Sequence, residues 1–174
     1  MFADPRHNIE QLGISDGAIV ADFGSGSGFY SLEAALAVAP SGKVYAVDVQ
    51  RELLERLKEE AKEHHIRNIE IIVGDLEKLG GSKLREGSCD VVIASNILFM
   101  IGDKKNFLLE ARRVLKPKGR LLGIDWAASF SQMGPQPTHV FYKDDAMKLC
   151  KELGFVFDRE IHTGAQHYGI IFRK

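Results

Sequence analysis

The sequence has few cysteines and no long apolar run, and these absences exclude several classes of protein. Cys89 and Cys150 are the only cysteines among 174 residues. Neither lies in a CxxC pair or in a His/Cys spacing that suits a metal, so a disulfide scaffold and a structural zinc site are excluded and we expect no metal. The longest nearly continuous apolar run, residues 91–101, is interrupted by Ser95 and Asn96. It is far shorter than the ~20 residues that a membrane-spanning helix needs.

The sequence also lacks an excess of either charge. Lys and Arg number 23, Asp and Glu number 24, and the formal net charge is −1. Because a polyanion is held by excess positive charge, we expect no nucleic-acid partner. Residues 1–13 show no charged segment followed by an apolar one, which argues against a secretory signal. We therefore expect a cytoplasmic globular protein without a membrane span.

Short β-branched apolar runs alternate with longer amphipathic segments along the whole chain. This pattern predicts strands at 18–23, 43–47, 69–73, 90–94 and 120–125. Helices are expected at 29–39, 51–64, 103–115 and 144–153, with a proline-containing loop at 127–139. The last two runs, 155–161 and 166–172, have the spacing of a hairpin.

The alternation of strands and helices is typical of right-handed βαβ units, which build a mostly parallel sheet with helices on both faces. The hairpin adds an antiparallel C-terminal strand to this α/β fold. No linker or repeat divides the chain, so we expect residues 1–174 to form a single domain, with 1–13 as a short N-terminal cap segment. Ligands of such sheets bind outside the carboxyl ends of the strands.

The densest motif, DFGSGSG, lies where the first strand runs directly into a helix. Its alternating glycines, Gly24, Gly26 and Gly28, let a ligand approach the main chain closely. A dinucleotide motif would need a glycine where Phe29 stands. Asp22, two residues before the first glycine, would repel a pyrophosphate and favour a cation such as an α-ammonium or a sulfonium. The alternative is that Asp22 only caps the following helix.

Acidic residues also end the next two strands. Asp48 follows the glycine turn by ~20 residues, the position from which a carboxylate accepts hydrogen bonds from ribose hydroxyls. Asp75 comes just after the third strand and can accept from an adenine amino group, while Val49 and Leu76 offer apolar faces to the ring. The alternative for Asp75 is a solvated turn residue. Three carboxylates at successive strand ends predict a site for a nucleoside.

The sequence resembles the class I S-adenosylmethionine-dependent methyltransferases. The resemblance rests on DFGSGSG, the acid that ends the second strand, GD after the third, CDVVIASNILFMI at the fourth and RVLKPKGRL before the fifth. It covers residues 14–126 and is similar to the small-molecule branch that includes ubiquinone/menaquinone and arsenite methyltransferases. It implies a Rossmann-like seven-stranded sheet, with S-adenosylmethionine as cofactor and S-adenosylhomocysteine as product.

The resemblance also implies a set of cofactor-binding residues. Asp22 would lie near the methionine end, the glycine turn against the methionine and ribose parts, and Asn96 beneath the methyl group. The complete set is Asp22, Gly24, Ser25, Gly26, Gly28, Asp48, Val49, Asp75, Leu76 and Asn96.

Candidate residues for binding the methyl acceptor are chosen by their position near the strand ends. Methyl transfer requires aligned reactants and the exclusion of water, and it does not require a fixed catalytic motif. Trp126 follows the fifth strand and would form an apolar wall. His139, in the loop after it, is the candidate general base, with an exposed loop histidine as the alternative. Tyr30 would line the pocket or pack the first helix. We expect His162 and His167, which flank the hairpin turn, to lie at the surface.

The sequence therefore predicts a methyltransferase that acts on a small-molecule or lipid-like acceptor at O, N or C. One alternative is a non-catalytic S-adenosylmethionine-binding or interaction domain. Another is an RNA-modifying methyltransferase, suggested by a local basic cluster: Arg112, Arg113, Lys116, Lys118 and Arg120. Arsenite methyltransferases depend on several cysteines, which this chain lacks. Because the segment 1–13 is short, a second subunit in a homodimer would be one way to close the pocket.

Overall fold

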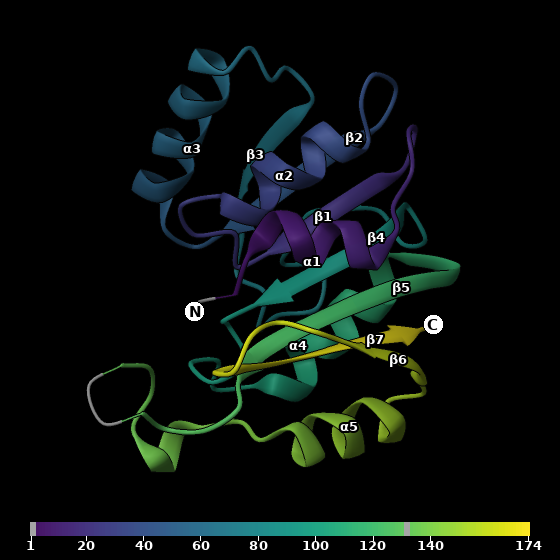
Figure 1. Ribbon diagram of the computed structural model, residues 1–174. Helices are drawn as coiled ribbons and strands as arrows, with labels where there is room; N and C mark the ends of the chain where they lie inside the picture. The colour runs from purple at the N-terminus through teal and green to yellow at the C-terminus, as the bar shows by residue number, and fades with distance from the viewer. Residues whose placement is uncertain (1–2, 131–132) are drawn as a thin grey trace.

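The computed structural model describes residues 3–130 and 133–174 and shows a sheet covered by helices on both faces (Figure 1). The helices are α1 (Pro5–Leu12), α2 (Phe29–Ala37), α3 (Arg51–Glu63), α4 (Lys104–Val114), α5 (Lys143–Glu152) and a short 3₁₀ helix, η1 (Pro137–His139). The strands are β1 (Ile19–Phe23), β2 (Lys43–Asp48), β3 (Ile69–Val73), β4 (Cys89–Ser95), β5 (Leu115–Trp126), β6 (Val156–Ile161) and β7 (His167–Arg173).

The sheet has seven strands in the order β3-β2-β1-β4-β5-β7-β6. The first five of these pair in parallel, whereas β7 runs antiparallel to both β5 and β6. The order reverses between β1 and β4, and this reversal is the switch point outside which ligands bind in open α/β sheets. The predicted mostly parallel sheet with an antiparallel C-terminal hairpin is confirmed.

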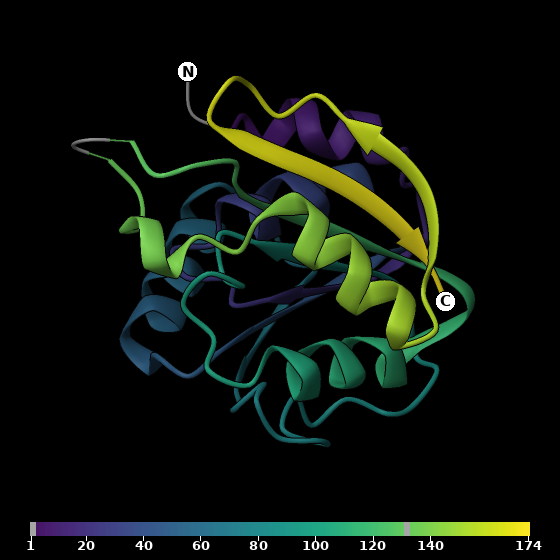
Figure 2. The same cartoon turned by 90° about the horizontal axis from the view of Figure 1, so that it is seen from below.

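Two apolar cores lie on opposite faces of the sheet. One face packs against α1 and α2 through Ile9, Leu12, Ala34 and Val38, and α3 adds Leu54 and Leu57 over the neighbouring Ala46. The other face packs against α4 and α5 through residues such as Phe107, Leu108 and Cys150. Figure 2 shows α4 and α5 together on one side of the sheet, away from α1. The helices therefore hold the carboxyl ends of the parallel strands in fixed register.

The fifth strand differs from its prediction. It begins at Leu115, directly after α4, rather than at residue 120, and its pairing with β4 is irregular between Cys89 and Val91. A bulge of this kind accommodates Pro117, which has no amide hydrogen for a regular ladder, and Lys118, whose φ is +65°. The strand is therefore longer than its apolar residues alone indicate.

The segment 127–139, expected to be a loop, contains the 3₁₀ turn η1 at its end. Pro137 stands at the first position of η1, where a missing amide hydrogen costs nothing. The part of the predicted loop at residues 131–132 lies outside the described residues. His139 is thus the last residue of a short helical turn.

The N-terminal segment forms a helix that is fixed at both ends. Asp4 accepts a hydrogen bond from the His7 amide at 3.3 Å, Pro5 begins α1, and Gly13 ends it with φ of +63°. Within α1, Asn8 is buried against α2, and Gln11 is bonded to the connection between β6 and β7. Helix α1, in the segment expected as a short cap, therefore connects α2 to the β6–β7 connection of the C-terminal hairpin.

Candidate active site

A cleft of about 560 Å³ opens at the carboxyl ends of β1, β2 and β4. The start of α1 and the turn after β4 form its other sides. The residues that line it are Ala3, Pro5, Asp22, Gly24, Ser25, Gly26, Phe29, Tyr30, Asp48, Val49, Gln50, Glu77, Ser95, Asn96, Ile97, Met100 and Ile101. Most of the residues predicted from the sequence to bind the cofactor are thus brought together at one place.

The glycine turn presents its backbone to this cleft. The Gly24 amide donates to the carbonyl of Val47 at 2.8 Å, which holds the turn against β2. Gly24, Gly26 and Gly28 all have positive φ, a conformation that other residues adopt at a cost. No atom lies within 4 Å of the place where a Cβ on Gly26 would stand. Gly26 therefore leaves room for a ligand directly against the main chain, whereas Gly28 leaves room for the Leu57 side chain.

Asp22 is a buried carboxylate at the floor of the cleft, only 2% exposed. Its Oδ2 accepts a 2.6 Å hydrogen bond from the Ser31 hydroxyl in α2. Burial raises the pKa of Asp22 to about 7, partly offset by that hydrogen bond, and the charge of Asp48 raises the pKa further. No cation among the described residues is paired with Asp22, so its negative charge is available to a positively charged ligand.

Asp48 joins the ends of two strands. Its Oδ2 accepts from the Gly26 amide at 2.9 Å and its Oδ1 from the Gln50 amide at 2.8 Å. Each carboxylate oxygen retains a second lone pair that can accept from a ligand hydroxyl. Val49, the next residue, lies at the mouth of the cleft and is 62% exposed.

Two buried polar atoms in the cleft have no hydrogen-bond partner among the described residues. They are Oδ1 of Asn96 and Oγ of Ser25. Asn96 has φ of +54°, and its amide donates to the carbonyl of Ile124 on β5 at 2.8 Å. Because buried polar groups are normally satisfied by protein, ligand or water, these two atoms are available to a polar ligand in the cleft.

Two of the residues expected to contact the adenine, Asp75 and Leu76, do not line the cleft. Asp75 is paired with Lys78 at 2.9 Å and accepts from the Glu77 amide, and it is not among the residues that line the cleft. Leu76 is buried in the core against the α4 face. Glu77 lines the cleft and accepts from the Asp103 amide at 2.6 Å. Glu77 was not predicted from the sequence, because Asp75, in the GD pair after the third strand, was the acidic residue assigned to the adenine.

The residues expected on the acceptor side separate into two groups. Tyr30 lines the cleft, and its hydroxyl accepts a 2.7 Å hydrogen bond from Asn8. Trp126 and His139 do not line the cleft. Trp126 packs against His167, with ring centroids 4.4 Å apart, and His139 is exposed on η1.

The expectation that His167 lies at the surface is wrong. It is the first residue of β7, opposite Trp126 of β5, its ring packs on the Trp126 indole, and the residue is 6% exposed. Only the pairing of distant strands produces this burial. His162, by contrast, is exposed as expected.

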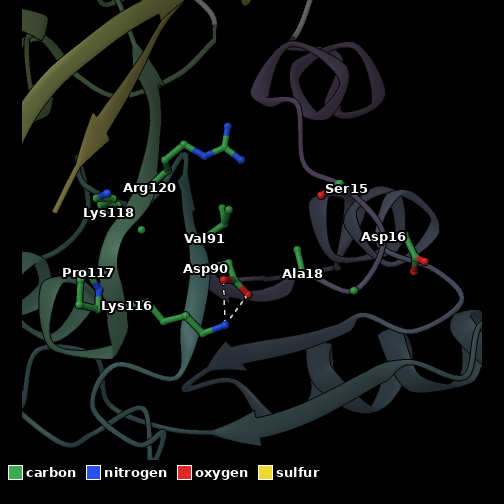
Figure 3. Close-up of a pocket in the computed structure, with 11 residues that line it drawn as sticks. Ser15, Asp16, Ala18, Asp90, Val91, Lys116, Pro117, Lys118 and Arg120 are labelled. Carbon is green, nitrogen blue, oxygen red and sulfur yellow. Dashed lines mark hydrogen bonds and ion pairs between the residues drawn. The ribbon is translucent and has the colours of Figure 1, made fainter.

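A second cleft, of about 460 Å³, lies at the amino ends of β1 and β4 (Figure 3). Lys116 reaches across it to Asp90, with Nζ 2.8 Å from both carboxylate oxygens. Arg120 donates to the carbonyls of Leu12 and Gly13. The cations Lys116 and Arg120 of this cleft are thus engaged within the protein, whereas the unpartnered atoms of Ser25 and Asn96 lie at the opposite edge of the sheet.

Within residues 3–130 and 133–174, no three His, Cys, Asp or Glu side chains are grouped closely enough to hold a metal ion. In the same ranges, no helix has the length and apolar character needed to span a bilayer. Cys89 and Cys150 are both buried, and burial raises the pKa of each thiol.

The parallel sheet, the acid-flanked glycine turn and the cleft at the switch point are the features on which the comparison with known methyltransferases can be made. Residues 14–166 match the family described as a methyltransferase domain, and the chain belongs to that family. A crystal structure of a SAM-dependent methyltransferase from Aquifex aeolicus superposes with a TM-score of 0.89 at 27% identity. That superposition covers 99% of this chain and 90% of the other. The predicted family, fold and cofactor are confirmed.

Curated relatives carry several activities. The chain is 31% identical over 153 residues to a demethylmenaquinone methyltransferase of Lactococcus lactis, covering 88% of this chain and 58% of that one. It is 29% identical over 137 residues to an arsenite methyltransferase of Halobacterium salinarum, covering 79% of this chain and 33% of that one. The chain thus spans only about a third to three fifths of the length of these relatives.

The cleft fits the cofactor of this family. The cationic methionine end of S-adenosylmethionine would lie near the buried, unpaired carboxylate of Asp22. The ribose hydroxyls of the cofactor would donate to the carboxylate of Asp48. The unpartnered atoms of Ser25 and Asn96 supply further polar contacts. The open space at Gly26 permits close approach to the backbone.

Proposed function

We propose that this chain binds S-adenosylmethionine in the cleft at the carboxyl ends of β1, β2 and β4 and transfers its methyl group to a small-molecule or lipid-like acceptor, at O, N or C. The observation that supports this proposal most strongly is Asp22, an unpaired buried carboxylate beside a glycine turn. When bound, the cofactor supplies a methyl group already activated on a sulfonium. The protein then has to align the two reactants and exclude water.

In this proposal Asp22 attracts the positively charged methionine end of the cofactor. The backbone of Gly24, Ser25, Gly26 and Gly28 packs against the methionine and ribose parts, and Asn96 lies beneath the methionyl chain. Asp48 holds the ribose diol and Val49 covers one face of the adenine. Asp75 and Leu76 keep their proposed roles at the adenine amino group and the other ring face. For Asp75, this requires its ion pair with Lys78 to open, and for Leu76 it requires the buried side chain to become accessible from the cleft.

The mouth of the cleft favours an acceptor with an apolar part. Phe29 and Met100 are 65% and 62% exposed there, which leaves large apolar side chains in contact with water. Such surfaces are commonly covered by a ligand. The buried cysteines argue against thiol-based binding of arsenite, because neither Cys89 nor Cys150 can be reached from the cleft lining.

An RNA acceptor is disfavoured by how the basic cluster is used. Arg113 is paired with the buried Glu110 at 2.7 Å, Lys116 with Asp90, and Arg120 with backbone carbonyls. These side chains support the fold and contribute little free positive charge. We therefore propose that nucleic acid is not a partner.

We also propose that residues 1–174 form one methyltransferase domain, that the protein is cytoplasmic, and that a homodimer covers the cleft mouth. The support for the homodimer is that Phe29 and Met100, two large apolar side chains of the cleft lining, are exposed and would be covered by a second subunit. Light scattering in the presence and absence of S-adenosylhomocysteine tests the dimer.

The direct test of the proposed function is ligand-induced stabilisation followed by turnover. S-adenosylmethionine and S-adenosylhomocysteine should raise the melting temperature, because they bind the folded state only, whereas NAD should not. We expect micromolar dissociation constants, or about −8 kcal/mol. Asp16→Ala, at the opposite edge of the sheet, is the matched control and should bind normally. Absence of heat and of stabilisation at millimolar ligand would reject the cofactor site.

A further inference from the structure

Tyr30 brings a hydroxyl group to the wall of the proposed cofactor cleft. The residue lines the cleft and is 8% exposed. Its oxygen accepts a 2.7 Å hydrogen bond from Nδ2 of Asn8, and the hydroxyl of Ser95, which also lines the cleft, lies beside it. Burial raises the pKa of Tyr30 above its ordinary value of 10.0, so the hydroxyl keeps its proton at neutral pH. Tyr30 and Ser95 are therefore two neighbouring neutral donors at one place in the cleft.

Asn8 supports the Tyr30 hydroxyl from outside the cleft. It lies in α1, is 1% exposed and is not among the residues that line the cleft. Helix α1 packs on α2 over one face of the sheet, which fixes Asn8 beside Tyr30 (Figure 1). Because an amide nitrogen can only donate, the Tyr30 oxygen is the acceptor in this hydrogen bond. The proton of Tyr30 is thus left to be donated elsewhere.

The Asp22 carboxylate lies in the same part of the cleft as these hydroxyls. Asp22 of β1 is in register with Ile93 of β4, and Ser95 follows Ile93 by two residues. Residues two apart in a strand point to the same face, so Asp22 and Ser95 share the face on which α1 and α2 pack. One strand spacing of ~4.8 Å and two residues of ~3.4 Å place their backbones roughly 8 Å apart. Ser31, the neighbour of Tyr30 in α2, donates to Asp22 at 2.6 Å.

The charges around this part of the cleft favour a zwitterion over a simple anion. In the described chain, no Lys, Arg or His is among the residues that line the cleft. The charges of Asp22 and Asp4 reach the Tyr30 hydroxyl and raise its pKa, so an isolated anion there would be repelled. An α-amino acid group carries an ammonium and a carboxylate on one carbon. The ammonium can meet Asp22 while the two carboxylate oxygens accept from the two hydroxyls.

We infer that the hydroxyls of Tyr30 and Ser95 bind the α-carboxylate of S-adenosylmethionine, and that Asn8 is a positioning residue that directs the Tyr30 proton toward it. This inference rests on the proposed function and assigns Tyr30 to the cofactor instead of the methyl acceptor. With the ammonium at Asp22, the cleft recognises the complete amino-acid group. It therefore discriminates against a ligand that keeps the adenosine and the amine but lacks the carboxylate.

The ligand test compares S-adenosylhomocysteine with its decarboxylated analogue, in which a 3-aminopropyl group on sulfur replaces the amino-acid chain. Both ligands carry the same nucleoside and one ammonium group, so they differ only at the carboxylate. Calorimetry on the wild type should show that the analogue binds about tenfold more weakly, as expected for the loss of a charge-assisted hydrogen bond.

Tyr30→Phe keeps the ring and removes the hydroxyl. We expect it to bind S-adenosylhomocysteine about tenfold more weakly and the analogue within about twofold of the wild type. A merely structural role for Tyr30 would weaken both ligands equally. Tyr168→Phe is the matched control, because the Tyr168 hydroxyl is bonded to the Phe141 carbonyl at 2.9 Å and does not line the cleft. This control should bind both ligands as the wild type does.

The positioning role of Asn8 is tested by reversing its polarity. Asn8→Asp has nearly the same shape, but its carboxylate accepts the Tyr30 proton and withdraws it from the ligand. We expect this variant to bind the two ligands within about twofold of each other. Asn8→Ala removes the supporting donor without supplying an acceptor, and should bind S-adenosylhomocysteine about threefold more weakly and the analogue normally.

The possible results separate the inference from the proposed function. If S-adenosylhomocysteine fails to bind the wild type, the proposed function fails. If it binds no more tightly than the analogue, or if Tyr30→Phe weakens both ligands equally or neither, the inference is overturned and the cofactor site stands. Thermal melts show whether each variant is folded. If Tyr30→Phe does not fold, Ser95→Ala decides, because it should weaken S-adenosylhomocysteine alone.

Discussion

The backbone amide of Gly26 donates a 2.9 Å hydrogen bond to Oδ2 of Asp48, which ties the glycine turn after β1 to the end of β2. The other oxygen of Asp48 is held by the Gln50 amide. The two segments proposed to contact the methionine and the ribose are therefore fixed to one another before any ligand binds. Preorganisation of this kind lowers the cost of ordering the site on binding.

Asp48→Ala should weaken S-adenosylhomocysteine binding by about 1.5 to 3 kcal/mol, the range for hydrogen bonds to a charged group. It should also lower the free energy of unfolding by about 1 to 2 kcal/mol, because two backbone amides lose their acceptor. Calorimetry and urea denaturation measure the two effects. Asp48→Asn, which keeps the shape and an acceptor, is the control and should recover part of the stability. Normal affinity in Asp48→Ala would contradict the ribose role.

Asp22 should make both stability and cofactor affinity depend on pH. Since its pKa is raised from 3.8 to about 7 in the folded state, the folded protein binds the proton more tightly than the unfolded chain. The stabilisation from this group is complete below about pH 4 and is lost as pH rises to about 7. Denaturation of the ligand-free protein at about pH 5 and about pH 8 should show this loss, and Asp22→Asn should abolish it.

Affinity for the cofactor should change in the opposite direction. Ionised Asp22 attracts the cationic methionine end, so the association constant should rise with pH up to about 7 in the wild type and stay flat in Asp22→Asn. Calorimetry across this pH range measures both. A variant that binds as tightly as the wild type at high pH would show that Asp22 does not face the ligand's charge.

Asp75 and Glu77 are the two carboxylates that could contact the adenine, and their variants should differ in cofactor affinity. Asp75 is paired with Lys78, whereas Glu77 lines the cleft. If Asp75 reads the adenine amino group, Asp75→Ala should weaken S-adenosylhomocysteine binding by about 1 kcal/mol or more. Lys78→Ala should then bind more tightly, since it releases the carboxylate. Loss of affinity in Glu77→Ala alone would move the adenine contact to Glu77.

Gly26 and Gly28, two of the three glycines of the turn after Asp22, should respond differently to substitution by alanine. In Gly26→Ala the new methyl group stands in open space within the cleft, so stability should fall by only about 1 kcal/mol, from the positive φ, while cofactor binding is lost. In Gly28→Ala the methyl group meets Leu57, so stability should fall by about 2 kcal/mol or more. Thermal melts with and without S-adenosylhomocysteine separate the two cases.

Local patterns were enough to predict most of the fold. The spacing of Leu54, Leu57 and Ala61 predicts the face of α3 that is buried, and each β-branched run became a strand. The end of α4 at Val114 and the start of β5 at Leu115 could not be predicted from local patterns. Pro117 and Gly119 look like a chain break, but pairing with β4 extends the strand through a bulge.

The amino-acid sequence by itself determined where the residues proposed to bind the nucleoside stand along the chain, because each follows a strand whose apolar pattern is local. The parallel register of β1, β2 and β4 then brings Asp22, Asp48 and Asn96 to one edge. Only the tertiary structure decided that His167 is buried and His139 exposed. The antiparallel pairing of β5 and β7 places His167 against Trp126, a residue 41 positions away in the sequence. Long-range strand pairing of this kind leaves no local pattern, so burial of a polar side chain becomes visible only in the folded protein.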